Sequence, residues 1–371
     1  MSGFRQDQVN AAHVMVVGCG ALGNEVLKNL VLMGVTHIVA VDFDVVETGN
    51  LTRNILFTKE DAERHRRKVD VVEERLKQIN PAIEIKTIFG DISFDVGLGL
   101  IRKMDVIIGC VDSRWARYCI NRLAMRAGVP WVDGGIDNLE GTARVFAPGK
   151  NCYACNLGPE GLKELSQRMP CSGIIRRQEQ AGSAPTTSII ASVIGAIQVQ
   201  EALKLIQKDF GTSLCGRMLY YEGEHMTVHT ADYRAYDDDC PEHDLWTPVK
   251  ATNVDATMSV KEALSHWYEE LETEDVTLCL TNDCFVDYVS RRDNDVRTYV
   301  MQPGRLVEDY IEQDGSLKGL QSNALYQHEY HHINIDFPYP ELTLTQLGIP
   351  KDDILHAVAD GQDFFLELNN R

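Results

Sequence analysis

A glycine-rich turn close to the start of the chain constrains the fold more strongly than any other feature. Residues 14–17 form an apolar run that predicts a buried parallel strand. The spacing G-x-G-x-x-G follows at Gly18, Gly20 and Gly23, and a helical pattern then covers residues 21–33 before a second apolar strand. This order is the context of a dinucleotide fingerprint, and it predicts a doubly wound α/β sheet.

The residues around the turn predict a nucleotide ligand. Glycines let the backbone approach a phosphate, and the N-terminus of the following helix favours an anion. Asp42 follows the second strand directly, with Asp44 two residues later, and a carboxylate at this place can accept hydrogen bonds from ribose hydroxyls. On this fingerprint alone, a nicotinamide dehydrogenase is favoured over an enzyme that uses ATP.

Four polar residues that follow the second strand change this interpretation. Asn50 and Arg53 lie in the segment NLTRN, Lys68 comes next, and Asp112 follows a further apolar run. Their order resembles the ThiF/MoeB/ubiquitin-activating family over about residues 3–243. The resemblance implies a Rossmann-like adenylation domain that transfers AMP from ATP to the C-terminal glycine of a ubiquitin-like protein. A dehydrogenase would leave these four residues unexplained.

The resemblance also implies a role for each site residue. Asn50, Arg53 and Lys68 are expected to contact the phosphates, and Asp112 is expected to coordinate a catalytic Mg²⁺. A lone carboxylate suits Mg²⁺, which keeps several waters and takes further ligands from phosphate. Arg53, Lys68 and Asp112 would act by stabilising charge on the triphosphate. The alternatives are a solvated surface position for Arg53 and a helix N-cap for Asp112. The expected cofactor-binding set is Gly18, Gly20, Gly23, Asp42, Asp44, Asn50, Arg53, Lys68 and Asp112.

Two short pairs of metal-ligand residues lie far apart in the sequence. The first is Cys152-x-x-Cys155, which alone is ambiguous between redox chemistry and zinc. The second is Cys240-x-x-His243. Together they resemble the split zinc site of the family, although the usual second pair there has two cysteines. Thiolate and imidazole are both ordinary zinc ligands, so we expect a structural Zn²⁺ in a zinc knuckle, with free thiols as the alternative.

The segment of about residues 156–187 corresponds to the crossover loop of the family. In ubiquitin-activating relatives, a cysteine of this loop receives the activated protein as a thioester. Here the position before the segment AGSAPTTS holds Gln180, and the only thiol of the loop is Cys171. Arg176 and Arg177 would lower the pKa of a nearby thiol. We therefore predict Cys171 as the thioester acceptor, with a spare metal ligand or a packed cysteine as the alternatives.

The acidic residues gather in the last third of the chain. Residues 237–371 hold 28 acidic and 9 basic residues and so carry the entire net charge of −19. This balance argues against a nucleic-acid partner. We expect an adenylation domain over 1–247 and a smaller acidic α+β domain over 248–371. The acidic surface is either simply solvated or a docking surface for a basic protein, which in this family would be a conjugating enzyme.

The composition of the chain predicts where the protein is located, and the family resemblance predicts how it assembles. Ten cysteines in 371 residues do not suggest a disulfide scaffold and fit the reducing cytoplasm. The chain shows no signal pattern, and we expect no apolar run long enough to cross a bilayer. A homodimer is expected because relatives pair two adenylation folds. The cluster of His328, His331 and His332 is interpreted as a solvated loop.

These observations lead to one predicted function and two alternatives. The prediction is ATP-dependent adenylation of a ubiquitin-like protein, thioester transfer to Cys171 and hand-off to a conjugating enzyme. The first alternative is activation of a sulfur-carrier protein without a thioester. The second is a non-catalytic scaffold that keeps the nucleotide and presents its acidic domain.

Overall fold

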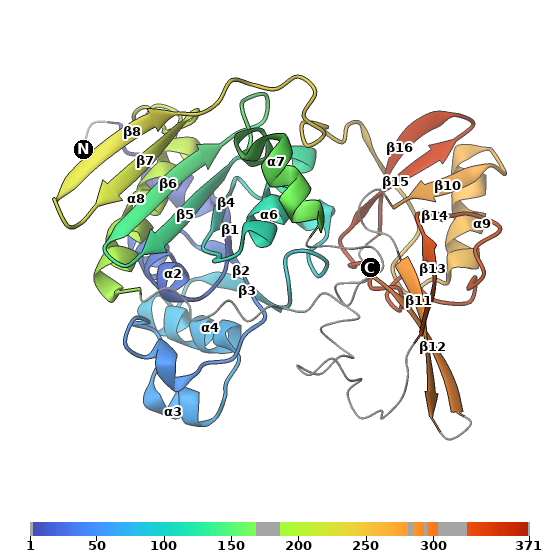
Figure 1. The fold of residues 1–371 in the computed structure, drawn as a ribbon, viewed down its shortest axis with the longest axis horizontal. Coiled ribbons are helices and arrows are strands. Elements are labelled where there is room, and N and C mark those ends of the chain that lie inside the picture. The colour runs from blue at the N-terminus through green and yellow to red at the C-terminus, as the bar shows by residue number, and fades with distance from the viewer. Residues whose placement is uncertain (1–2, 168–185, 281–284, 293–294, 303–324, 370–371) are drawn as a thin grey trace. The chain divides into compact units, whose positions relative to one another are not determined.

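The computed structural model describes residues 3–167, 186–280, 285–292, 295–302 and 325–369. The chain divides into two compact units, which are described separately (Figure 1). The first unit comprises Met1–Ser93, Ile101–Glu160 and Gly182–Leu245. The second comprises Phe94–Leu100, Gly161–Ala181 and Trp246–Arg371.

The first unit is built on an eight-stranded sheet with the order β3-β2-β1-β4-β5-β6-β7-β8. The first five strands in this order pair in parallel, and the last three are antiparallel. The strands are β1 (His13–Val17), β2 (His37–Asp42), β3 (Glu84–Phe89), β4 (Val106–Gly109), β5 (Trp131–Asp137), β6 (Glu140–Phe146), β7 (Arg217–Glu222) and β8 (Thr227–Asp232). The predicted α/β class, with a sheet rich in parallel strands, is confirmed.

Helices connect and cover these strands. They are α1 (Gln6–Ala11), α2 (Ala21–Met33), α3 (Lys59–Glu63), α4 (Lys68–Ile79), α6 (Arg114–Ala127), α7 (Tyr153–Gln167) and α8 (Ser188–Ile206). α2 begins after Gly20 and ends at Gly34, which adopts the left-handed conformation of a helix C-terminus with φ 91°. α2 and α8 pack closely, because a side chain at Gly195 would lie 2.9 Å from the Cβ of Glu25.

The apolar helix α8 corrects one expectation. By length and hydropathy alone it is able to cross a membrane, with a mean hydropathy of 1.6, so the expectation that no run is long enough was wrong. The packing of α8 indicates a helix of the protein core instead of a membrane span. Ile190, Ile194 and Val199 are buried in the same hydrophobic core as Val14 and Val16 of β1. We therefore interpret α8 as the core helix of the first unit.

The described residues of the second unit form two sheets and the helix α9. The five-stranded sheet has the order β14-β10-β15-β16-β9, in which β9 is parallel to β16 and the other pairs are antiparallel. The second sheet, β12-β11-β13, is antiparallel. The elements are β9 (Val249–Ala251), α9 (Val260–Leu271), β10 (Val276–Cys279), β11 (Phe285–Arg292), β12 (Asp295–Met301), β13 (Leu325–Tyr330), β14 (His332–Ile333), β15 (Ile354–Ala359) and β16 (Gln362–Glu367). Trp267 of α9 is fully buried in the core that these elements share.

Two local features of the second unit were not expected. His328 is solvated as expected, with 66% of its side chain exposed, but it lies on β13 and not in a loop. Its Nδ1 is 3.1 Å from the buried carboxylate of Asp287. Phe94–Leu100 also belongs to this unit although it lies far upstream in the sequence. There the backbone N–H of Leu98, the first residue of α5 (Leu98–Ile101), donates to the Oδ1 of Asp353 over 2.9 Å.

Candidate functional site

The glycine turn leaves its backbone open on one side. Gly18 has φ 94°, and a side chain there would come within 2.4 Å of the carbonyl oxygen of Cys110. A Cβ at Gly23 would lie 1.9 Å from the carbonyl oxygen of Gly18. These two glycines are therefore required by packing. A Cβ at Gly20 would meet no atom within 4 Å, so the turn presents bare backbone to open space there.

Asp42 fixes this turn from the end of β2. Its Oδ2 accepts from the N–H of Cys19 over 2.6 Å, and its Oδ1 accepts from the N–H of Asp44 over 2.7 Å. Burial raises the pKa of Asp42, although Lys68 and the two backbone N–H groups act in the opposite direction. The carboxylate expected to contact a ribose therefore also has a structural role in the turn.

Lys68 places a buried cation next to these two acids. It begins α4, its side chain is 9% exposed, and its Nζ lies 2.8 Å from the Oδ2 of Asp44. Burial alone would lower the pKa of Lys68, but the carboxylates of Asp42 and Asp44 outweigh it and raise that pKa. Lys68 is consequently charged at neutral pH, as a phosphate ligand must be.

The segment after β2 carries the two other residues assigned to the phosphates. Asn50 ends a short 3₁₀ turn, Thr48–Asn50, in which its Oδ1 accepts from the N–H of Glu47 over 2.9 Å. The N–H of Arg53 donates to the carbonyl oxygen of Asn50 over 3.1 Å. Arg53 is half-buried, so a fully solvated surface position does not describe it. Asn50 and Arg53 therefore belong to one continuous turn.

Asp112 is exposed and follows β4. The alternative that Asp112 caps the next helix was wrong: Ser113 is the N-cap of α6, and its Oγ accepts from the N–H of Ala116 over 3.0 Å. The side chain of Asp112 is thus not used by the helix. Because β1, β2 and β4 are parallel, Gly18, Asp42 and Asp112 all lie at the carboxyl edge of the sheet, where open α/β sheets bind ligands.

A buried ion cluster supports this edge, and the sequence analysis did not find it. Asp133 of β5 is fully buried and accepts from the Nε of Arg117 over 2.8 Å and the Nε of Arg144 over 2.9 Å. Arg117 also donates to the carbonyl oxygens of Val111, over 2.7 Å, and Gly134, over 3.0 Å. The cluster therefore holds the backbone on either side of the Asp112 loop. The members of this cluster lie on different elements, so no short spacing in the sequence predicts the cluster.

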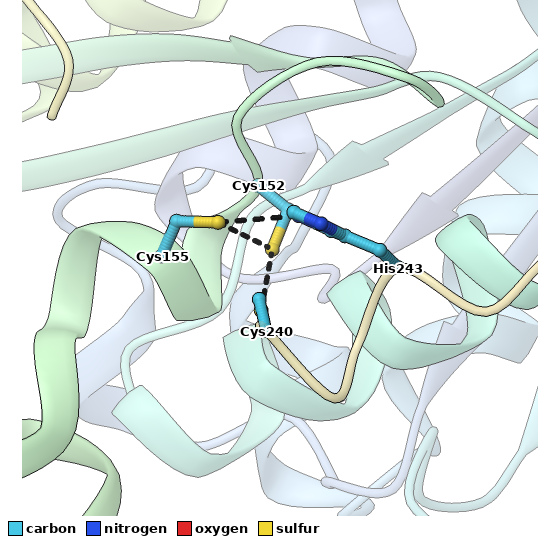
Figure 2. Close-up of side chains that lie close together, drawn as sticks. All are labelled: Cys152, Cys155, Cys240 and His243. Carbon is cyan, nitrogen blue, oxygen red and sulfur yellow. Dashed lines mark hydrogen bonds between the residues drawn. The ribbon is translucent and has the colours of Figure 1, made fainter. Parts of the chain in front are cut away.

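The four expected metal ligands come together in the first unit. Cys152 and Cys155 stand at the start of α7, and Cys240 and His243 follow β8 (Figure 2). The Sγ of Cys152 lies 3.7 Å from that of Cys155 and 3.8 Å from that of Cys240, and the Sγ of Cys155 lies 3.2 Å from the Nε2 of His243. All four ligand atoms are within 4.8 Å of one another.

This arrangement fits a tetrahedral zinc ion. Four ligands at about 2.3 Å from a central zinc have sulfur atoms about 3.8 Å apart, as found here. The hydrogen bond between the two thiols lowers the pKa of Cys152 to about 5 and raises the pKa of Cys240, so Cys152 is the first of this pair to form the thiolate that binds metal. Three sulfur atoms and one imidazole form a closed donor set of the structural kind, with His243 in the fourth position.

Comparison with known proteins gives the family. The family model described as "ThiF family" matches residues 2–242, well over half of the chain. The chain belongs to the ThiF family. Its relatives include the SAMP-activating enzyme E1 of Haloferax volcanii, which is 30% identical over 236 residues that cover 64% of this chain and 82% of the relative. The sulfur carrier protein adenylyltransferase of Thermus thermophilus is 30% identical over 58% of this chain and 77% of its own.

Two further comparisons agree with the ThiF assignment. The molybdopterin-synthase adenylyltransferase of Haemophilus influenzae is 30% identical over 60% of this chain and 86% of its own. Among solved structures, E. coli MccB superposes with a TM-score of 0.54 at 22% identity, over 64% of this chain and 68% of MccB, and supports the fold alone. The predicted class of enzyme, an adenylyltransferase of the ThiF family, is confirmed.

The cluster of Cys152, Cys155, Cys240 and His243 in this ThiF protein is tied to α6. Glu242, between the ligands Cys240 and His243, lies 2.5 Å from the hydroxyl of Tyr118 on α6. Asn121, one turn further along the helix, accepts from the N–H of Tyr153 over 2.9 Å. The same helix carries Arg117, which braces the Asp112 loop. No sequence pattern predicts these links, because each joins residues at least 30 positions apart.

The predicted thioester acceptor, Cys171, lies outside the described residues. Within the described part of the chain every cysteine is buried or half-buried. Burial raises the pKa of Cys19, Cys110 and Cys215 in the first unit. A raised pKa favours the protonated thiol, which is a poorer nucleophile than the thiolate.

Proposed function

We propose that this protein uses ATP and Mg²⁺ to adenylate the C-terminal glycine of a ubiquitin-like protein. The observation that carries the proposal is the set of groups at one edge of the sheet. The open glycine turn, the buried cation Lys68 and the free carboxylate Asp112 each follow or adjoin a different parallel strand. These are the groups needed to hold a triphosphate with its metal ion.

The proposed reaction needs no side-chain base, because the substrate carboxylate is already ionised. One carboxylate oxygen attacks the α-phosphorus, an O–P bond forms, and the bond to the leaving pyrophosphate breaks. Lys68 and Arg53 offset charge on the phosphates, Asn50 contacts them, and Asp112 holds the Mg²⁺ that polarises them. Catalysis would then consist of positioning and charge stabilisation.

Exchange of labelled pyrophosphate into ATP tests this step. The purified protein is mixed with ATP, Mg²⁺ and a panel of ubiquitin-like proteins that end in glycine. We expect exchange that depends on one such protein and that disappears in Asp112→Ala while the fold is retained. Normal exchange by Asp112→Ala would remove the assigned role of Asp112. Binding of NAD without exchange would favour a dehydrogenase instead.

The fate of the adenylate separates two versions of the proposal. Relatives include both a SAMP-activating enzyme E1 and a sulfur carrier protein adenylyltransferase. In the first version the thiolate of Cys171 attacks the glycine carbonyl of the adenylate, a thioester forms, AMP leaves and the thiol proton passes to solvent. The thioester is then handed to a thiol of a conjugating enzyme on the acidic second unit, which frees Cys171. In the second version the adenylate is passed to sulfur, and Cys171 has no catalytic role.

A non-reducing gel distinguishes these versions. An adduct between the protein and its ubiquitin-like partner that a thiol reagent removes, and that is absent in Cys171→Ala, would establish the thioester. Exchange without an adduct would establish the sulfur-carrier version. Normal cellular activity of both Lys68→Ala and Asp112→Ala would favour a non-catalytic scaffold. We also propose a cytoplasmic homodimer, which light scattering tests directly.

A further inference from the structure

The side chain of Asn24, in the first turns of α2, makes three hydrogen bonds next to the glycine turn. It is fully buried. Its Nδ2 donates to the carbonyl oxygens of Cys19, over 2.7 Å, and Gly20, over 3.1 Å. Its Oδ1 accepts from the N–H of Leu56 over 2.9 Å. Both polar atoms of the amide are therefore used, and all three partners are backbone groups of other segments or of the turn itself.

The two bonds to carbonyl oxygens orient the turn. In a planar trans peptide, the C=O and N–H groups point in opposite directions. Because the carbonyls of Cys19 and Gly20 point toward Asn24, the N–H groups of Gly20 and Ala21 point away from it. The turn is also open at Gly20, where a Cβ would meet no atom within 4 Å. An anion there would meet two aligned donors at the start of a helix.

The third bond reaches the loop that carries the phosphate residues. Leu56 is three residues after Arg53, and its side chain is buried in the main core. Asn24 is thus the link between the glycine turn after β1 and the segment after β2. Asp42 provides a second tie, since it accepts from the N–H of Cys19. A shift of either segment would stretch a bond to Asn24.

We propose that Asn24 is a positioning residue for the phosphates of ATP: it aims the N–H groups of the glycine turn and fixes the Arg53 loop against that turn. The inference rests on the proposed use of ATP and deepens it. Asn24 touches no phosphate itself and acts through the backbone groups that it holds. It should therefore affect the binding of the triphosphate and leave the binding of adenosine unchanged.

Three substitutions of Asn24 remove its hydrogen bonds to different extents. Asn24→Ala removes all three bonds. Asn24→Asp keeps the acceptor for Leu56 but turns a carboxylate oxygen toward two carbonyl oxygens, which repel it. In Asn24→Ser the hydroxyl can donate to the Gly20 carbonyl four residues back, as serines in helices do, but it is too short to reach Leu56. The matched control is Gln207→Ala, which removes a fully buried amide at the end of α8 that accepts from the N–H of Arg5.

Calorimetric titration with ATP and Mg²⁺, and separately with adenosine, provides the readout. In Asn24→Ala and Asn24→Asp we expect the Kd for ATP to rise about tenfold or more, the effect of losing one or two oriented hydrogen bonds. Asn24→Ser should lie between these variants and the wild type. The Kd for adenosine should stay within about twofold of the wild type, and Gln207→Ala should change neither constant.

These measurements distinguish a specific role of Asn24 in phosphate binding from a general loss of stability. Thermal unfolding without ligand shows which variants fold, and Asn24→Ser keeps the test open if the other two do not. If the Asn24 variants bind ATP with the Kd of the wild type, or lose affinity for ATP and adenosine equally, the role of Asn24 is overturned. The proposed function stands in that case, because the wild type binds ATP. A wild type that binds no ATP would overturn both.

Discussion

At the scale of single residues, the buried carboxylate of Asp61 in the first unit is held by several hydrogen-bond donors. Asp61, of which the side chain is 2% exposed, accepts from the hydroxyl of Thr58 over 2.6 Å and from the Nη1 of Arg66 over 2.9 Å. Arg75 lies 3.3 Å from its other oxygen. Burial alone would raise the pKa of Asp61, but these hydrogen bonds and charges outweigh it and lower that pKa.

The lowered pKa predicts how stability depends on pH. A carboxyl with a lower pKa in the folded state stabilises the protein above its unfolded pKa of about 3.9. This contribution is lost as the pH falls through the folded pKa. Asp61→Asn should lower the free energy of unfolding by about 2 kcal/mol at pH 7, because a neutral amide loses the charge-assisted hydrogen bonds that Asp61 accepts. Arg66 and Arg75 are partly exposed and keep Glu74 as a second partner, which limits the loss.

Urea unfolding of the wild type and of Asp61→Asn at several pH values checks this prediction. The difference between the two proteins should shrink as the pH is lowered below about 4. Asp70→Asn, a substitution in the first turn of α4, is the control and should behave as the wild type does. A difference for Asp61→Asn that is the same at every pH would mean that the charge of Asp61 is not what stabilises the fold.

At the scale of elements, the parts that the sequence predicted are those defined by short spacings. The glycine turn, the strand before it and the two ligand pairs each lie within a few residues. By contrast, Asn24 and Asp133 look like ordinary residues of a helix and a strand. Their importance comes from partners on other elements, and residue spacing carries no information about such pairing. A cap role was one alternative for Asp112, but its neighbour Ser113 is the residue that accepts from the N–H of Ala116.

The zinc knuckle allows a prediction at this scale, because it joins α7 to the segment after β8 and both to α6. Cys152→Ser removes one of four ligands. We expect the bound zinc, measured by elemental analysis, to fall from about one ion per chain to a small fraction of that value. The loss of metal should lower the free energy of unfolding by at least about 3 kcal/mol, which corresponds to a Tm lower by roughly 6–12 °C.

Cys215→Ser is the matched control for this experiment. Cys215 is half-buried in the same unit but does not belong to the ligand group. Its substitution should leave the zinc content at the value of the wild type. Equal zinc content in Cys152→Ser and the wild type would refute the site. Treatment of the wild type with a chelator should reproduce the lower Tm of Cys152→Ser, since both remove the same ion.

At the scale of the whole molecule, the two units are not two consecutive pieces of sequence. Phe94–Leu100 belongs to the second unit although it lies between β3 and β4 of the first. Gly97 has no room for a side chain there, since a Cβ would come within 2.3 Å of the carbonyl oxygen of Asp352. The acidic excess begins near residue 237 and the family resemblance ends near residue 243, and these two observations predicted a single boundary at residue 247. A segment of only seven residues, such as Phe94–Leu100, is too short to show a boundary in the composition of the sequence.

Removal of residues 248–371 tests this organisation. The remaining fragment keeps the glycine turn, Lys68 and Asp112, so it should still bind ATP. It also keeps Val96, Leu98 and Leu100, which are buried in the full chain and would lose the rest of their unit. Exposed apolar side chains promote association, so we expect the fragment to form oligomers or to precipitate. Size-exclusion chromatography with light scattering measures this.

The cause of this association is tested with substitutions in the fragment. Substitution of Leu98→Ser and Leu100→Ser together should restore a soluble species, because it removes the newly exposed apolar surface without touching the sheet of the first unit. The same pair in the full chain should instead lower stability, since there the side chains are buried. A fragment that is soluble without these substitutions would mean that Phe94–Leu100 does not depend on the second unit. The division of the chain would then lie at the single boundary near residue 247.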